Sequence, residues 1–246
     1  MSALPGTTGR RRLYLMRHGF VDYTSPEVRA AKDPTIAYLT EQGRDEAARA
    51  GEALKDVPFD LALCSGLRRT RETAQIVLQH HQTAPSLEDV PAFCELQSGQ
   101  YIDFKSAEQL AATMTFQFEQ AGQPGATFLE GGERFADAMV RIEQGIVELL
   151  SRPGWANALL VAHEGVNRLL LAWTLQAALS ASAGFEQDTG CINIIDFDLV
   201  PKNDSDGVQI ERAVIKALNL TPPNYLKNGM NLRSFEAIFT RNAGKS

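Results

Sequence analysis

The chain has 246 residues, of which 44% are hydrophobic and 22% are charged. These proportions are typical of a globular protein and exclude collagen-like, disordered and membrane-spanning classes. Lysine and arginine number 24 against 30 acidic residues, so the net charge of −6 argues against nucleic acid or an anionic membrane as partner. Three scattered cysteines give no disulfide framework and predict a cytoplasmic protein.

Short apolar runs alternate along the chain with longer segments of helical periodicity. The first half predicts a strand over 13–16, a helix over 40–55, a strand over 59–64 and a helix over 67–78. The second half predicts helices over 107–119 and 134–150, a buried strand over 158–162, a helix over 165–181, a hairpin of 191–199 with 208–218, and a short helix over 232–239.

The alternation of strands and helices predicts an α/β fold, a three-layer α/β/α sandwich around a mostly parallel sheet. No repeat or low-complexity linker divides the chain. We therefore expect a single domain over 1–246, with a helical lid or insertion over 105–150 and a C-terminal tail over 220–246.

Three polar clusters directly follow predicted strands: Arg17-His18-Gly19, Ser65 to Arg69, and His163-Glu164-Gly165. Ligands of parallel sheets bind at the carboxyl ends of the strands, so we expect these clusters to meet at one rim.

The residue types at this rim predict a site for a phosphoryl group. The guanidinium groups of Arg17 and Arg69 match phosphate oxygens. A neutral imidazole of His18 or His163 can attack phosphorus, and a protonated one stabilises phosphoryl charge. A metal ion is disfavoured, because the arginines would repel it and no carboxylate or thiol lies at ligand spacing from either histidine.

With these motifs the sequence resembles the histidine phosphatase superfamily, in its phosphoglycerate mutase-like branch. The matching segments are Arg17-His18-Gly19, Leu39-Thr40-Glu41-Gln42-Gly43, Ser65-Gly66-Leu67-Arg68-Arg69 with Thr73-Ala74, Glu95-Leu96, Gly131-Gly132-Glu133, and Val161-Ala162-His163-Glu164-Gly165-Val166. The resemblance implies a phosphoglycerate mutase-like fold and places the second arginine of the family on Arg69 rather than Arg68.

The resemblance also implies a mechanism. His18 attacks the phosphoryl group and becomes a phosphohistidine, while Arg17, Arg69 and His163 hold the phosphate oxygens. Glu95 protonates the leaving alcohol and then activates the water that hydrolyses the intermediate. Such an acid needs a raised pKa, which the apolar neighbours of Glu95 make plausible. No metal and no organic cofactor are implied.

Departures from the family pattern bear on the substrate. Phe20 replaces the usual Glu, and Thr24 stands where many members have Asn; with Tyr101 they are the predicted pocket residues. The Trp-Asn pair that is the hallmark of the mutases is absent from this segment. We therefore expect a phosphomonoesterase acting on a small-molecule phosphate ester.

Two alternatives stay open, a phosphoglycerate mutase-type isomerase and a non-catalytic phosphate-binding or scaffold protein. A homo-oligomer is also open, because apolar residues in the segment 225–239 could form a subunit-interface arm.

Overall fold

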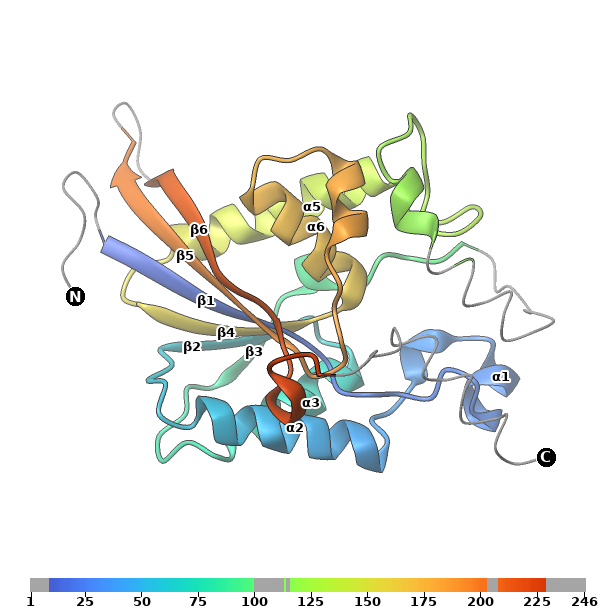
Figure 1. The fold of residues 1–246 in the computed structure, drawn as a ribbon, viewed down its shortest axis with the longest axis horizontal. Helices are drawn as coiled ribbons and strands as arrows, with labels where there is room; N and C mark the ends of the chain where they lie inside the picture. Colours follow the sequence, from blue (N-terminus) through green and yellow to red (C-terminus); the bar gives the residue numbers. More distant parts are fainter. Residues whose placement is uncertain (1–8, 100–112, 114–115, 203–207, 229–246) are drawn as a thin grey trace.

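The computed structural model describes residues 9–99, 113, 116–202 and 208–228. At its centre is a six-stranded sheet with the order β3-β2-β4-β1-β5-β6 (Figure 1). Strands β3, β2, β4 and β1 pair in parallel, whereas β5 pairs antiparallel with both β1 and β6. The strands are β1 Gly9–Arg17, β2 Leu61–Cys64, β3 Leu87–Asp89, β4 Asn157–Ala162, β5 Ile192–Pro201 and β6 Val208–Leu220.

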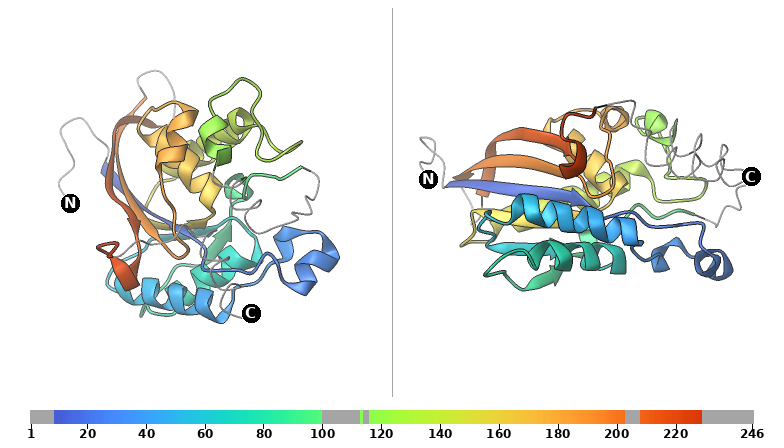
Figure 2. Two further views of the ribbon diagram at one scale, coloured as in Figure 1. Left: turned by 45° about the vertical axis from the view of Figure 1, so that its right-hand side comes forward. Right: turned by 60° about the horizontal axis from the view of Figure 1, so that its bottom comes forward.

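Helices cover both faces of this sheet (Figure 2). Helices α2 and α3 lie on one face, and α5 and α6 lie on the other. The short helix α1 lies beyond the carboxyl end of β1 (Figure 1). The predicted α/β/α sandwich is confirmed. The helices are α1 Pro26–Ala31, α2 Glu41–Leu54, α3 Arg68–Leu78, α5 Phe135–Ser151 and α6 Glu164–Thr174.

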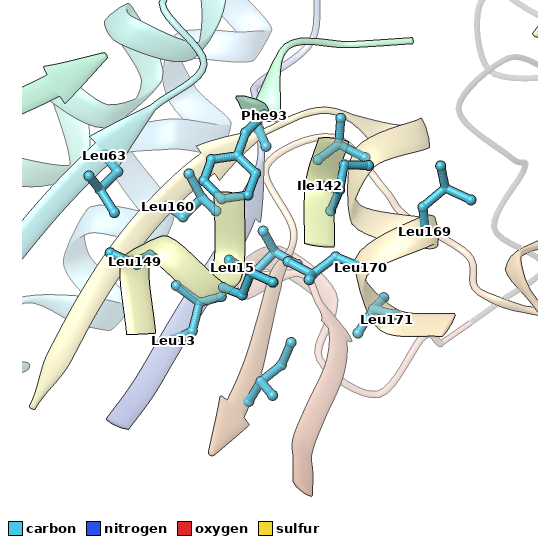
Figure 3. Close-up of a cluster of buried hydrophobic side chains, with 14 of the residues drawn as sticks. Leu13, Leu15, Leu63, Phe93, Ile142, Leu149, Leu160, Leu169, Leu170 and Leu171 are labelled. Atoms are coloured by element: carbon cyan, nitrogen blue, oxygen red, sulfur yellow. The ribbon is translucent and has the colours of Figure 1, made fainter. Parts of the chain in front are cut away.

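The alternation of side chains along β1 explains the two cores. Leu13 and Leu15 point into the cluster beneath α5 and α6, and Tyr14 and Met16 point into the cluster beneath α2 and α3. Figure 3 shows the first cluster, in which Leu15 of β1 lies beside Leu170 of α6. Full burial of each leucine contributes roughly 1.5–3 kcal/mol, so the central strands are held firmly on both faces.

The helix predicted over 165–181 is wrong in its second half. Helix α6 ends at Thr174, and Gln176 has a left-handed φ of 53°. The N–H of Ala177 then bonds the carbonyl oxygen of Ala172, which closes the helix end. Residues Leu179–Gly184 form a separate 3₁₀ helix. The alanine-rich sequence keeps a helical propensity through the break, so periodicity did not locate it.

Two short elements were missed, namely β3 with three residues and α1 with six. Both are too short for periodicity to reveal. The helix predicted over 107–119 and the one over 232–239 fall largely or wholly outside the described residues. Gln117–Gln120, at the end of the first, is a 3₁₀ helix.

The predicted lid over 105–150 is described only in part. Within it, α5 belongs to the outer layer of the sandwich, because Ile142, Ile146 and Leu150 are fully buried in the core. The single domain and its lid stay predictions. No helix of the described ranges has both the length and the apolarity to cross a membrane.

Candidate active site

Three adjacent strands bring the site together. The register aligns the last residues of β1, β4 and β2, so the residues that follow these strands share one rim. His18 follows β1, His163 follows β4 and Ser65 follows β2. The ring centroids of the two histidines lie 5.2 Å apart, with the rings inclined by 66°.

His18 is held as a neutral imidazole with a defined tautomer. Its Nδ1 lies 2.8 Å from the carbonyl oxygen of Gly19, which can only accept, so Nδ1 carries the proton. Nε2 therefore keeps its lone pair and accepts a hydrogen bond from Nε of Arg69 at 3.3 Å. Burial, Arg69 and Arg17 lower the pKa of His18 well below 6.5. A lone pair in a cationic pocket has the chemistry of a nucleophile.

His163 is hydrogen-bonded through Nε2, whereas His18 is hydrogen-bonded to the backbone through Nδ1. The hydroxyl of Thr70 donates its proton to the carbonyl oxygen of Leu67 at 2.8 Å. Because that proton is already used, Thr70 Oγ1 must be the acceptor in its 2.9 Å hydrogen bond with Ser65 Oγ. Nε2 of His163, 2.8 Å from that Oγ, is then the donor to Ser65. Nδ1 is left buried, deprotonated and without a hydrogen-bond partner among the described residues.

Burial, followed by Arg69 and the other nearby cations, lowers the pKa of His163 well below 6.5. The site thus presents an unprotonated nitrogen. An anion bound there needs a donor, so its binding favours protonation of Nδ1.

Arg17 is buried and fixed by the first turn of α6 and the loop before β5. Its Nη1 lies 3.0 Å from Oε2 of Glu164 and also donates to the carbonyl oxygen of Gln187. Glu164 accepts in turn from Nε and Nη2 of Arg168, at 3.0 and 2.8 Å. A network of charged groups therefore fixes the position of the Arg17 guanidinium.

The two neighbouring arginines at the start of α3 point in different directions. Arg69 is 3% exposed and donates from Nη1 to the carbonyl oxygen of Thr35 at 3.3 Å. Arg68 is exposed, with its guanidinium carbon 4.2 Å from the centre of the Tyr38 ring. Successive helix residues are about 100° apart around the axis, so only one of the pair can face the rim.

Glu95 follows the 3₁₀ helix Pro91–Phe93 and lies against the start of α6. Its Oε1 accepts from the Leu96 N–H at 3.0 Å and its Oε2 from the Gly165 N–H at 3.3 Å. A Cβ on Gly165 would lie 2.7 Å from Oε1, so a larger residue here would displace the Glu95 carboxyl group. Burial raises the pKa of Glu95 above 4.5, against the opposing effect of these hydrogen bonds.

Two of the three predicted pocket residues lie within the described residues. Phe20 is half-buried and its N–H donates to Oε2 of Glu46 at 2.9 Å. The Thr24 hydroxyl donates to Oδ1 of Asp22 at 2.7 Å in a local turn. Tyr101 lies outside the described residues.

Tyr23, which the sequence analysis did not assign, is the residue of this segment that contacts the cluster. Its hydroxyl lies 3.5 Å from Nε2 of His18, and the guanidinium carbon of Arg69 lies 5.7 Å from the centre of its ring. Ser65 was predicted at the rim but was given no role, and Glu46 was not singled out. Ser65 lies within a recognised motif, whereas nothing in the local pattern singled out Glu46.

Two motif glycines explain how the first loop is held. A Cβ on Gly19 would lie 2.2 Å from the carbonyl oxygen of Gly43, and a Cβ on Gly43 would lie 2.2 Å from that of Phe20. Thr40 caps helix α2, because its hydroxyl accepts from the Gly43 N–H at 3.1 Å. The loop after β1 therefore packs directly on the N-terminus of α2.

Within residues 9–99, 113, 116–202 and 208–228, no group of three or more His, Cys, Asp or Glu side chains is arranged to hold a metal ion.

Comparison with known proteins places this arrangement in a family. The family model described as "Histidine phosphatase superfamily (branch 1)" matches residues 13–200. An adenosylcobalamin/alpha-ribazole phosphatase of Salmonella typhi is 31% identical over 190 residues, covering 75% of this chain and 90% of the relative. A broad-specificity phosphatase of Saccharomyces cerevisiae is 26% identical, covering 66% of this chain and 69% of the relative.

A solved structure has the same fold. The crystal structure of a putative alpha-ribazole-5'-P phosphatase from Escherichia coli K-12 is similar with a TM-score of 0.63 and 26% identity, covering 85% of this chain and 96% of that one.

Proposed function

This chain belongs to the histidine phosphatase superfamily (branch 1), and from that premise we propose that it is a metal-independent phosphomonoesterase that hydrolyses a small phosphorylated metabolite through a phosphohistidine on His18. The observation that carries the proposal is the tautomer of His18. The Gly19 carbonyl holds the proton on Nδ1, and the unprotonated Nε2 faces Arg69.

In the first step Nε2 of His18 attacks phosphorus and the ester P–O bond breaks. The leaving alkoxide takes its proton from Glu95, whose pKa burial raises, which favours the acid form relative to an exposed glutamate. Arg17, Arg69 and a protonated His163 hold the phosphoryl oxygens, and their charges offset the negative charge of the transition state.

In the second step water attacks the phosphohistidine. The carboxylate of Glu95 takes a proton from this water as the new P–O bond forms and the P–N bond breaks. Phosphate leaves, and His18 returns to its neutral form with Nδ1 bonded to Gly19. Glu95 is again protonated, so the cycle closes.

The substrate class is a small alcohol phosphate. The relatives named as alpha-ribazole phosphatases support including alpha-ribazole 5'-phosphate in a substrate panel. The Tyr23 ring beside Arg69 favours a substrate with an apolar or aromatic portion near the phosphoryl group.

The test is to quench the enzyme in alkali during turnover of an aryl phosphate and to locate the phosphoryl group by mass spectrometry. We expect it on His18, with phosphate released into solution and no modification of a His18→Ala variant. Turnover by a folded His18→Ala variant would contradict the proposal.

Two further assays, of phosphoglycerate isomerisation and of phosphate binding, separate the two alternatives left open by the sequence. Isomerisation of phosphoglycerate without release of phosphate would identify a mutase. Binding of phosphate without any turnover of the panel would identify a non-catalytic phosphate-binding protein.

A further inference from the structure

An ion pair outside the proposed phosphate site holds the segment that carries Glu95. Nε and Nη2 of Arg141, on α5, donate to the two carboxylate oxygens of Glu133, each at 2.9 Å. Nη1 of the same arginine donates to the carbonyl oxygens of Ala92 and Cys94, at 2.6 and 3.0 Å. Arg141 thus holds the backbone directly before Glu95.

Glu133 holds the backbone on the other side of Glu95. Its Oε2 accepts from the Gln97 N–H at 3.2 Å, and its own N–H donates to the Gln97 carbonyl oxygen at 2.8 Å. The pair Glu133–Arg141 therefore brackets Glu95, contacting the chain one residue before it and two residues after it.

Close packing fixes this bracket to the core. One turn after Arg141, a Cβ on Gly145 would lie 2.7 Å from Cβ of Ala92, so α5 approaches the Glu95 segment closely at this point. A Cβ on Gly132 would lie 2.5 Å from the Gln97 carbonyl oxygen. Phe93 and Ile142 are fully buried in the same cluster. The position of α5 therefore fixes the position of the backbone on both sides of Glu95 through the pair Glu133–Arg141.

We propose that Glu133 and Arg141 are positioning residues, which hold the backbone on both sides of Glu95 so that its carboxyl group stays against the start of α6 and within reach of the leaving oxygen. The inference rests on the proposed function, because it assumes Glu95 as the acid. Proton transfer needs heavy atoms about 2.6–3.2 Å apart, and a displacement of about 1 Å can cost on the order of 10²-fold in rate.

Arg141 has a different task from the arginines of the rim. Both hydrogens of its Nη1 are directed at carbonyl oxygens, and its remaining bonds go to Glu133. Four of its five N–H groups therefore donate to protein oxygens, which argues against a role in binding the substrate phosphate. Its side chain is 27% exposed and that of Glu133 15%, so both are shielded enough for the pair to fix geometry.

The test compares esters with different leaving groups, because an alkyl alcohol needs protonation far more than p-nitrophenol does. The measured quantity is kcat/KM, which reports the first chemical step. For Glu133→Gln and Arg141→Lys we expect a loss of about 10-fold or more with an alkyl phosphate and a clearly smaller loss with p-nitrophenyl phosphate. In a Glu95→Gln background the same changes should add nothing to this selectivity.

A matched control lies on the same helix. Arg134 and Asp137 form a bidentate pair at 2.7 Å, but their side chains are 59% and 55% exposed. Arg134→Gln and Asp137→Asn should leave both esters unaffected. Melting temperatures show that each variant is folded, and Glu133→Gln, which keeps the size of the side chain, supplies a test if Arg141→Lys does not fold.

The outcomes separate the two proposals. Equal losses with both esters, or none, in the Glu133 and Arg141 variants overturn the positioning role while a leaving-group-dependent loss in Glu95→Gln keeps the acid. If Glu95→Gln itself loses no more with the alkyl ester than with the aryl ester, the acid assignment fails and the positioning role fails with it.

Discussion

The two histidines of the rim show how the same side chain acquires different chemistry from its second partner. Both follow central parallel strands, both are buried, and both have a pKa well below 6.5. His18 is bonded at Nδ1 by a backbone carbonyl and directs Nε2 at Arg69. His163 is bonded at Nε2 by Ser65 and leaves Nδ1 without a partner among the described residues.

The contrast agrees with the roles that we propose, His18 as the nucleophile and His163 as a ligand of the phosphoryl oxygens. Among the described residues, the lone pair on Nε2 of His18 contacts only Arg69 and Tyr23, which a phosphoryl group can displace. The free nitrogen of His163 has to gain a proton before it can bind an anion, so its role depends on the ligand. Which nitrogen faces the site is decided by the group behind each ring.

The largest effect is expected for His18→Ala, which removes the nucleophile. We expect a loss of turnover on the order of 10⁴-fold or more, because the covalent route is closed. The fold should persist, since His18 lies at the rim and not within either core cluster. Phosphate release and the melting temperature are the two measurements. His163→Ala should retain more activity than His18→Ala, and the reverse order would contradict the assignment.

The next effect concerns the paired arginines of α3. Arg69→Ala should lower kcat/KM by about 10²–10³-fold, typical for the loss of one preorganised donor to the transition state. Arg68→Ala is the matched control, because Arg68 is exposed and stacks on Tyr38. Steady-state kinetics with one aryl phosphate compares them. Comparable losses in the two variants would show that the site extends over the outer face of α3.

A smaller effect is expected for Ser65→Ala, which releases Nε2 of His163. The imidazole can then change its tautomer and orientation, and we expect a loss of phosphatase activity of about 10–100-fold, as for other residues that orient a functional histidine.

Titration calorimetry of phosphate in two buffers of different ionisation enthalpy should show proton uptake by the wild-type protein. Binding without proton uptake would exclude protonation of His163 by the ligand.

The smallest effect concerns stability against pH. The folded pKa values of His18 and His163 are lowered, so the unfolded chain binds more protons once the pH falls below about 6.5, and stability falls with it. Each histidine contributes at most about 1.4 kcal/mol per pH unit in this range. Glu95, with its raised pKa, opposes the trend. Melting temperatures between pH 7 and pH 5 should fall less for His163→Gln than for the wild type.

Phosphate sharpens the same comparison. If the bound anion favours protonated His163, added phosphate should stabilise the wild type more at pH 5 than at pH 7, at equal occupancy. A stabilisation that does not depend on pH, or one retained in full by His163→Gln, would contradict the ligand-dependent role of this histidine.

Much of the fold could be predicted from the sequence. The apolar run 158–162 and the strand before Arg17 are recognisable because a strand buried on both faces has to be continuously hydrophobic. The polar clusters at their ends predicted the rim, since adjacent parallel strands end at one edge. The break after Thr174 could not be predicted, because it depends on one left-handed residue in a helix-prone segment.

The sequence by itself determined five of the six strands that the structure describes, the motif residues and their order, because local propensity and periodicity are carried by neighbouring residues. Only the tertiary structure decided which nitrogen of each histidine carries no proton and what holds Glu95. Those properties come from contacts between residues far apart in the chain, such as Ser65 with His163 and Arg141 with Cys94. No local pattern can encode such contacts, because each exists only when two separate elements pack against each other.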